Sequence, residues 1–401
     1  MKLLRTAGFA IIAVSVAAVL FIASQVSASG KETGEIDTIV KDAFSAHHIS
    51  SLVATVIQNG KITFQKAYGV DPLFPYAENA PSNPYALGPL SQVLTGAGVL
   101  ILNDQGKLSL EEPVSTYLPG LPEAWRPITI GQLLTHRSGL PAFPKTAKTF
   151  DEAVQEAAKQ PLRFKPGSQR GENSADYDML GQVIEKVTGQ KYIFFMEKTV
   201  FKQMKFVATG DFSMLLFRFV APTDTKFNAT TSTQGAVTVS QGASASTLTG
   251  HGGYGTYDPM AKARMMDLLT RNLPPYSVPS RGLASNMQDV IRIATAIFEP
   301  GAVKQFTESN YLALAPGWKG CDTGKDTMLT AAGLGTSGYN INVKLLPSRK
   351  VAVILLWRSD KATDNSILDE ESQNILESAL GIPVSNWVCT GGDEDQDDDQ
   401  Q

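Results

Sequence analysis

Residue types that could carry out chemistry are sparse in this chain and lie far apart in the sequence. His136 and Ser138 are of the types that serve as base and nucleophile in acyl-transfer enzymes. Glu172 could act as a general base, and Ser91 is a second candidate nucleophile near the start of a predicted helix. The elements around these residues decide whether any of them can react.

Metal-dependent chemistry is not predicted, and we expect no cofactor. The chain has four histidines and two cysteines, and they do not form a zinc-ligand pattern. His47 and His48 are adjacent, so they would not share a helix face. His251 precedes Gly252-Gly253-Tyr254 in a glycine-rich segment, and a flexible turn is the favoured interpretation.

Two pairs of predicted strands lie near the two ends of the chain. Each pair consists of two β-rich runs, which cover residues 52–58, 61–68, 338–346 and 351–357. The first pair flanks Asn59-Gly60, which is typical of a hairpin turn because both residues tolerate positive φ. An amphipathic helix is expected over residues 366–380 and should end at Gly381.

The middle of the chain is predicted to be mainly helical. Apolar residues follow a helical period from Pro89 to Asp104, and Gly106 suits a C-terminal cap. Further helices are expected over residues 129–135, 151–159 and 176–189. Residues 221–257 are rich in small and polar residues, so we expect long loops or an irregular insertion there.

These elements predict an α+β fold. An antiparallel sheet built from both chain ends would be flanked by helices, and a separate helical lobe would lie beside it. We expect one domain over residues 29–390, with the sheet lobe at about 36–80 and 281–380 and the helical lobe at about 85–280. Ligand sites favour such junctions, so a cleft between the lobes is the expected binding site.

Short motifs then follow one another in a specific order. They are Leu108 to Val114, Tyr117 to Pro119, Leu133 to Pro141, Phe164 to Gly167, Asp176 to Gly181, Gly282 to Ser285 and Thr336 to Tyr339. The series resembles the serine β-lactamase-like family of class C β-lactamases, D-Ala-D-Ala peptidases and related esterases. The resemblance runs from about residue 50 to residue 357. It implies the fold described above and an acyl-enzyme mechanism, in which a lysine one helical turn after a nucleophilic serine accepts its proton.

The first family motif has lost the residues that would perform this reaction. Gly-Ser-x-Ser-Lys falls on Gly88-Pro89-Leu90-Ser91-Gln92. Pro89 has no hydroxyl to acylate, and Gln92 is not a base near neutral pH. Proline suits the first turn of a helix, so we expect the helix itself to persist.

Two further family motifs are altered as well. Tyr-x-Asn falls on the segment from Glu172 to Ser174, although a shift of one residue would bring Asn173 into the motif. Lys/His-x-Gly falls on the segment from Ala332 to Leu334, which removes the cation and adds bulk where the family has glycine. Changes in three separate motifs predict lost chemistry rather than altered chemistry.

The remaining serines are weak replacements for the nucleophile. On a helix, Ser91 would project in a different direction from Pro89, and a surface position or a contact within the lobe is the favoured interpretation. His136 and Ser138 lie in a segment that the resemblance implies to be structural.

We therefore expect a family member without the acyl-serine reaction that acts as a binding or accessory protein. Its ligand would be an unidentified small molecule or peptide held in the cleft. A divergent serine hydrolase or acyltransferase with relocated catalytic groups is the alternative. A purely structural or interaction protein is a third hypothesis.

Residues 1–28 are typical of a signal peptide. Lys2 and Arg5 precede an apolar run over residues 7–23, and small residues would allow cleavage after Ala28. We expect a secreted or extracytoplasmic protein. An uncleaved membrane anchor is the alternative, because the run is close to the length of a membrane span.

Export bears on several other residues. In an exported protein, Cys321 and Cys389 are expected to form a disulfide, and two unpaired thiols are the alternative. Asn228 begins a glycosylation sequon that matters only in a eukaryotic host.

Residues 391–401 form an acidic tail that we expect to be disordered. The remaining charges are nearly balanced, which argues against nucleic acid as a partner.

Overall fold

The computed structural model describes eleven stretches of the chain. They are residues 33–71, 79–213, 215, 229–231, 237–239, 273–298, 316–322, 326–334, 338–359, 368–381 and 388–389. The predicted signal peptide, the sequon asparagine Asn228, the segment from His251 to Tyr254 and the acidic tail lie outside these residues. Within the described stretches, no helix is both long enough and apolar enough to cross a membrane.

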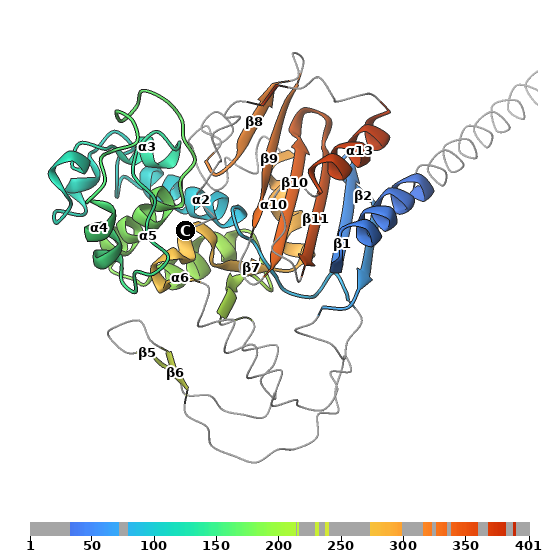
Figure 1. The fold of residues 1–401 in the computed structure, drawn as a ribbon, viewed down its shortest axis with the longest axis horizontal. Coiled ribbons are helices and arrows are strands. Elements are labelled where there is room, and N and C mark those ends of the chain that lie inside the picture. Colours follow the sequence, from blue (N-terminus) through green and yellow to red (C-terminus); the bar gives the residue numbers. More distant parts are fainter. Residues whose placement is uncertain are drawn as a thin grey trace, which may run out of the picture.

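The larger sheet is antiparallel and is built from both ends of the chain, as predicted (Figure 1). Its described strands lie in the order β12-β8-β9-β10-β11-β1-β2. Their bounds are β1 (Ile49–Gln58), β2 (Lys61–Gly69), β8 (Lys319–Asp322), β9 (Thr327–Leu334), β10 (Tyr339–Leu346), β11 (Val351–Ser359) and β12 (Val388–Cys389). The N-terminal β1 pairs with the C-terminal β11, where Thr55 lies opposite Ile354. The α+β fold class is therefore confirmed.

The first hairpin turns at the predicted dipeptide. Asn59 and Gly60 have φ values of 52° and 74°, so both occupy the left-handed region that a tight two-residue turn requires. The register shifts between Val56 and Ile57, just before this turn.

The central strands are buried along most of their length because both faces of the sheet are covered. In β1, Val53 and Ile57 pack into one core, whereas Leu52 and Val56 pack into the other. Successive side chains of a strand point to opposite faces, so a strand between two cores carries apolar residues on both of its faces. β11 shows the same pattern, since its nine residues are all buried.

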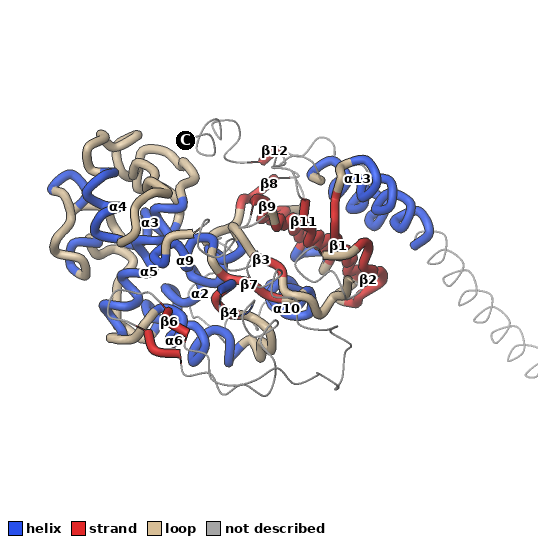
Figure 2. The backbone as a smooth tube through the Cα atoms, turned by 60° about the horizontal axis from the view of Figure 1, so that its bottom comes forward, coloured by secondary structure: helices blue, strands red, loops and turns tan. Residues whose placement is uncertain are grey.

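Two helices cover one face of the sheet. A helix at residues 33–46 and α13 (Asp369–Leu380) lie side by side there in both backbone views (Figure 2). Ile36 and Ile375 contribute to the core beneath them, and His47 Nε2 lies 2.8 Å from Glu371 Oε1. α13 ends at Gly381, whose φ of 64° provides the expected left-handed cap.

The second core joins the other face of the sheet to the helical lobe. The main helices on this side of the sheet, including those of the helical lobe, are α2 (Leu90–Asp104), α3 (Ile130–Leu134), α4 (Phe150–Ala157), α5 (Ser174–Thr188), α6 (Tyr192–Met196), α9 (Val278–Arg281) and α10 (Met287–Phe298). Short helical turns accompany them: η1 (Val114–Thr116), η2 (Glu123–Trp125), η3 (Glu197–Phe201), η4 (Pro275–Ser277) and η5 (Pro347–Arg349). Helices are thus present at each of the predicted positions in the middle of the chain.

Short strands complete the architecture. A small sheet has the order β3-β7-β4, formed by β3 (Tyr85–Ala86), β7 (Leu283–Ser285) and β4 (Gly210–Asp211). β5 (Ala229–Thr231) pairs with β6 (Val237–Val239) inside the segment where loops were expected. The small sheet ties the chain just before α2 to the segment before α10.

The C-terminal strand lies at the edge of the larger sheet. β12 pairs with β8, and Cys389 lies directly opposite Cys321 in this ladder. Cys321 is disulfide-bonded, and Cys389 is the other cysteine of the chain. This register places the two cysteines of the predicted disulfide directly opposite each other.

Candidate functional site

The first turn of α2 contains the position where the family pattern places its nucleophile. Pro89 stands at the N-cap with helical angles, φ −58° and ψ −25°, which agrees with the expectation that proline would preserve the helix. The amides of residues 90, 91 and 92 donate to the carbonyls of residues 87, 88 and 89 at 3.0, 3.0 and 2.9 Å. Proline has no N–H of its own. This helix start therefore offers neither a hydroxyl nor an amide donor at position 89.

The Pro89 ring packs against Gly333 on β9. A Cβ atom at Gly333 would lie 2.6 Å from Pro89 Cγ, closer than real Cβ atoms approach. Glycine is therefore required for this approach of α2 to the strand. The contact joins the position of the family's nucleophile to the strand of its third motif.

The other two residues of the third motif provide no cation. Ala332 is exposed and lies opposite Asn342 in the β9–β10 ladder. Leu334 ends β9 opposite Asn340. The charge that the family pattern would place at position 332 is therefore missing from this strand.

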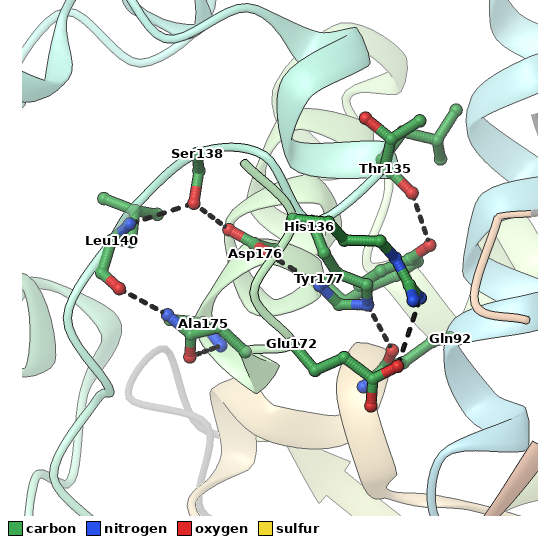
Figure 3. Close-up of polar contacts among 12 residues, drawn as sticks. Gln92, Thr135, His136, Ser138, Leu140, Glu172, Ala175, Asp176 and Tyr177 are labelled. Carbon is green, nitrogen blue, oxygen red and sulfur yellow. Dashed lines mark hydrogen bonds and ion pairs between the residues drawn. The ribbon is translucent and has the colours of Figure 1, made fainter. Parts of the chain in front are cut away.

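Gln92 lies one helical turn after Pro89, on the same side of α2. It is 9% exposed, and its Oε1 lies 3.1 Å from His136 Nε2. His136 reaches Asp176 through its other ring nitrogen, with 2.8 Å between Nδ1 and Oδ2 (Figure 3). The position of the family lysine is thus tied into a buried polar network.

Ser138 completes this network. Its hydroxyl accepts the Leu140 amide at 3.0 Å and donates to Asp176 Oδ1. Burial raises the pKa of Asp176, although hydrogen bonds from His136 and Ser138 oppose that rise. The three side chains are almost fully buried, with exposures of 3% for His136, 1% for Ser138 and 0% for Asp176.

The network is not a Ser-His-Asp catalytic triad. In a triad the histidine lies between the serine and the carboxylate, whereas here Asp176 lies between His136 and Ser138. His136 Nε2 faces Gln92 instead of a hydroxyl. The arrangement suits a structural role for the His136 and Ser138 segment, as predicted from the sequence.

The backbone around His136 is held in an uncommon conformation. Its φ is 56°, in the left-handed region that non-glycine residues visit rarely. The His136 carbonyl accepts the Gly171 amide at 2.9 Å, and the Tyr177 ring lies 5.1 Å from the imidazole. Tyr177 also donates its hydroxyl to the Leu134 carbonyl at 2.8 Å. These contacts fix the direction in which the imidazole points.

The second motif forms the start of α5. Asn173 is the N-cap, and its Oδ1 accepts the Ala175 amide at 3.0 Å while its Nδ2 donates to the Leu140 carbonyl at 2.8 Å. Ser174 is the first residue of the helix. The residue at the shifted motif position is therefore occupied with capping the helix.

Glu172 precedes this cap and is exposed. Its Oε1 lies 3.1 Å from Arg170 Nη2, and the same nitrogen lies 3.3 Å from the Trp318 carbonyl. Glu172 thus has a cation as its partner, and no hydroxyl that it could deprotonate is bonded to it among the described residues.

Ser91 is oriented away from any reactive position. It is fully buried, and its Oγ accepts the Leu283 amide at 3.2 Å. The Ser91 carbonyl also accepts the Thr95 hydroxyl at 3.0 Å. The hydroxyl joins α2 to β7, which fits the alternative of a contact within the lobe.

Asp176 and Arg170 are site residues that the sequence analysis did not identify. Asp176 stands four residues before Leu180 and eight before Ile184, so it falls in line with the apolar face of α5. An acidic residue on a buried helix face indicates a partnered carboxylate, and this signal could have found it. Arg170 carries no comparable signal, because its partners come from residue 172 and residue 318.

Metal binding has no support in the described stretches. No group of three or more His, Cys, Asp or Glu side chains there could hold a metal ion. The histidines His47 and His136 each contact one carboxylate instead.

Comparisons with known proteins agree with the architecture. A family model described as Beta-lactamase matches residues 36–376. The chain is 27% identical over 198 residues to Protein flp of Staphylococcus aureus (strain MW2), covering 44% of this chain and 40% of that protein. It is 28% identical over 178 residues to penicillin-binding protein PbpX of Bacillus subtilis (strain 168), covering 43% of this chain and 45% of that protein. The matches thus span less than half the length of these relatives.

Two solved structures share the fold over most of the chain. An octameric penicillin-binding protein homologue from Pyrococcus abyssi superposes with a TM-score of 0.62 and 16% identity, covering 87% of this chain and 78% of that one. The crystal structure of SurE with D-Leu gives a TM-score of 0.61 and 17% identity, covering 88% and 77%. At these identities the likeness concerns the fold alone.

Proposed function

This chain belongs to the β-lactamase family, and we propose that it has lost the acyl-serine reaction of that family and acts by binding. Pro89 is the observation that carries this proposal. The residue stands at the first turn of α2, where an acylated serine would have to stand. An ester cannot form on a proline, so the side chain excludes the first covalent step at this position.

Pro89 also removes a second catalytic contribution. Acyl-transfer sites stabilise the oxyanion with backbone N–H groups, and proline has none. The next three amides already donate to carbonyls of the same turn. A carbonyl ligand near Pro89 would therefore meet no free amide from this turn of α2, and the barrier to attack would stay high.

Gln92 cannot replace the missing base. A carboxamide does not take up a proton near neutral pH, and its Oε1 is already engaged by His136. Ser91 and Ser138, the serines nearest in sequence to the altered residues and to His136, are 0% and 1% exposed. Neither of these two serines therefore favours a relocated hydrolase centre.

We further propose that the protein is exported and binds a small molecule or peptide at this site. The signal-peptide pattern of residues 1–28 supports export. The name of the relative PbpX, a penicillin-binding protein, suggests penicillins and cell-wall peptides as first probes. A protein that binds such a ligand without converting it would act as an accessory protein.

The direct test is covalent labelling. The purified full chain would be incubated with a fluorophosphonate probe and with a fluorescent penicillin, and its intact mass measured. We expect no adduct, and we expect thermal shifts with members of a muropeptide panel. An adduct that disappears when a single serine is replaced would overturn the proposal. The matched control is the double variant Pro89→Ser with Gln92→Lys, which restores the first motif in the same scaffold.

A further inference from the structure

The Gln92 carboxamide is held at one end. Its Oε1 faces His136 Nε2 at 3.1 Å, and no other hydrogen bond of this side chain is made to the residues that the structure describes. A carboxamide has an acceptor end and a donor end. Which end faces His136 therefore decides which end is left for a ligand. The hydrogen bonds around the ring decide which end of the amide faces it.

Ser138 limits where protons can lie in the network. Its oxygen accepts the Leu140 amide, and its hydroxyl donates to Asp176 Oδ1. Oδ1 is thus an acceptor and carries no proton. Any proton shared by the pair lies between Asp176 Oδ2 and His136 Nδ1, which are 2.8 Å apart.

Burial then selects the charge of the pair. Asp176 is 0% exposed and His136 is 3% exposed, and an uncompensated charge at such a site is costly. Arg163 acts on Asp176 from a distance, but its side chain is exposed and donates to the Glu172 carbonyl, so solvent screens it. Asp178 also interacts with Asp176; it is buried too, and it provides no positive charge to compensate a carboxylate there. The start of α5 partly offsets a negative charge on Asp176, but among the described residues no buried cation other than the His136 ring contacts it, so we expect the pair to be neutral overall.

Both neutral arrangements leave a proton on Nε2. If Asp176 is a carboxylate, His136 is an imidazolium and both ring nitrogens carry hydrogen. If Oδ2 is protonated, it donates to Nδ1, and the single ring hydrogen lies on Nε2. In either case His136 donates to Gln92, so the glutamine must present its oxygen to the ring and its NH2 group away from it.

We propose that Gln92 is the specificity-determining residue of the site, and that its NH2 group selects a ligand with an uncharged carbonyl oxygen. This inference rests on the proposed function. The neutral donor stands one helical turn from Pro89, at the position of the family lysine. Ala332 supplies no cation, and Arg170 is already ion-paired with Glu172. An anionic group would therefore gain no cation from either of these residues, whereas a carbonyl needs only a donor.

The first arm of the test reads the ring proton directly. The full chain labelled with 15N-histidine would be studied by NMR at pH 7, with the His136 signals assigned by their loss in His136→Gln. We expect a protonated, pyrrole-type Nε2. A pyridine-type Nε2 would overturn the inference. This reading needs no variant of Gln92 and so does not depend on the folding of one.

The second arm of the test measures whether the site prefers a neutral carbonyl compound to an anion or a cation. N-methylacetamide, acetate and methylammonium would each be titrated while the Gln92 side-chain NH2 signals are followed. We expect a saturable shift with N-methylacetamide and at least a tenfold weaker response to the two ions. An equal or stronger response to either ion, or none to N-methylacetamide, would overturn the inference.

Two variants of position 92 sharpen this arm. Gln92→Glu keeps the shape and the acceptor for His136 but presents an oxygen to the ligand, so N-methylacetamide binding, followed by ligand-observed NMR, should fall at least tenfold. Gln92→Met removes both ends and should lose binding similarly. Binding retained in both variants would contradict the inference. A covalent adduct in the labelling experiment would overturn the proposed function, whereas a pyridine-type Nε2 in a protein that forms no adduct would overturn this inference and leave the proposed function standing.

Discussion

The helices α2 and α5 both begin at altered family motifs, but they begin in different ways. α5 is capped by a side chain, since Asn173 accepts the Ala175 amide and also holds the Leu140 carbonyl. α2 begins at Pro89 without a side-chain cap, and its first amides bond to the preceding backbone. The start of α5 thus depends on the chemistry of its residues, whereas the start of α2 depends on backbone geometry and packing. This difference explains how a proline can stand at position 89 without disturbing the start of the helix.

The largest loss of stability is expected from a substitution in the first turn of α5. Asp176→Leu removes the carboxylate that holds His136 and Ser138, and leaves both without their buried partner. We expect a loss of about 3–5 kcal/mol in the free energy of unfolding, measured by urea denaturation. Asp176→Asn is the control that keeps an acceptor for one partner and should lose less. Equal stability of Asp176→Leu and the wild type would show that the network does not support α5.

Asp178, which lies on the same helix, should make the free energy of unfolding depend on pH. Burial raises the pKa of Asp178 to about 8, whereas an unfolded aspartate has an ordinary value near 4. The folded state then binds more protons than the unfolded state between these values, so stability falls as pH rises through this window. The slope from this group approaches about 1.4 kcal/mol per pH unit. Urea denaturation at several pH values should show a flatter dependence in Asp178→Asn, and identical slopes would exclude Asp178 as the cause.

Packing at the start of α2 gives a smaller effect. Gly333→Ala would bring a methyl group against Pro89 Cγ, and we expect a loss of about 1–3 kcal/mol from overpacking. Pro89→Ala removes the atom that clashes, so the double variant should lose less than the sum of the two single variants. A double-mutant cycle measures this coupling. Additive losses would mean that the strand and the helix move apart freely.

The smallest changes in stability are expected from substitutions at the two helix starts, which allows a direct comparison of α5 with α2. Asn173→Ala removes the cap of α5 and should cost about 1–2 kcal/mol. Pro89→Ala should change stability by less than about 1 kcal/mol, because no hydrogen bond depends on the proline side chain. Thermal unfolding of the two variants side by side checks this order. A larger loss at position 89 would reverse the comparison.

Much of the fold could be predicted because its signals are local. Asn59-Gly60 predicted the first turn, and Gly381 predicted the end of α13, since few residues other than glycine and asparagine adopt the left-handed angles found there. Apolar periodicity predicted α2 and α5 to within a residue or two. The assignment of Pro89 and Gln92 to one helix face followed from the same period, so the altered positions could be identified from the sequence.

The partners of these residues could not be predicted in the same way. Gln92 meets His136 across 44 residues of sequence, and His136 meets Asp176 across 40. Likewise, Pro89 meets Gly333 only where α2 approaches β9. Composition and spacing by themselves determined the class of fold and predicted which positions lack the family's reactive groups, because those properties depend on residue type and local period. Only the tertiary structure decided that the glutamine is oriented by a buried histidine, because that contact exists only once separate segments pack together and exclude water from the charges between them.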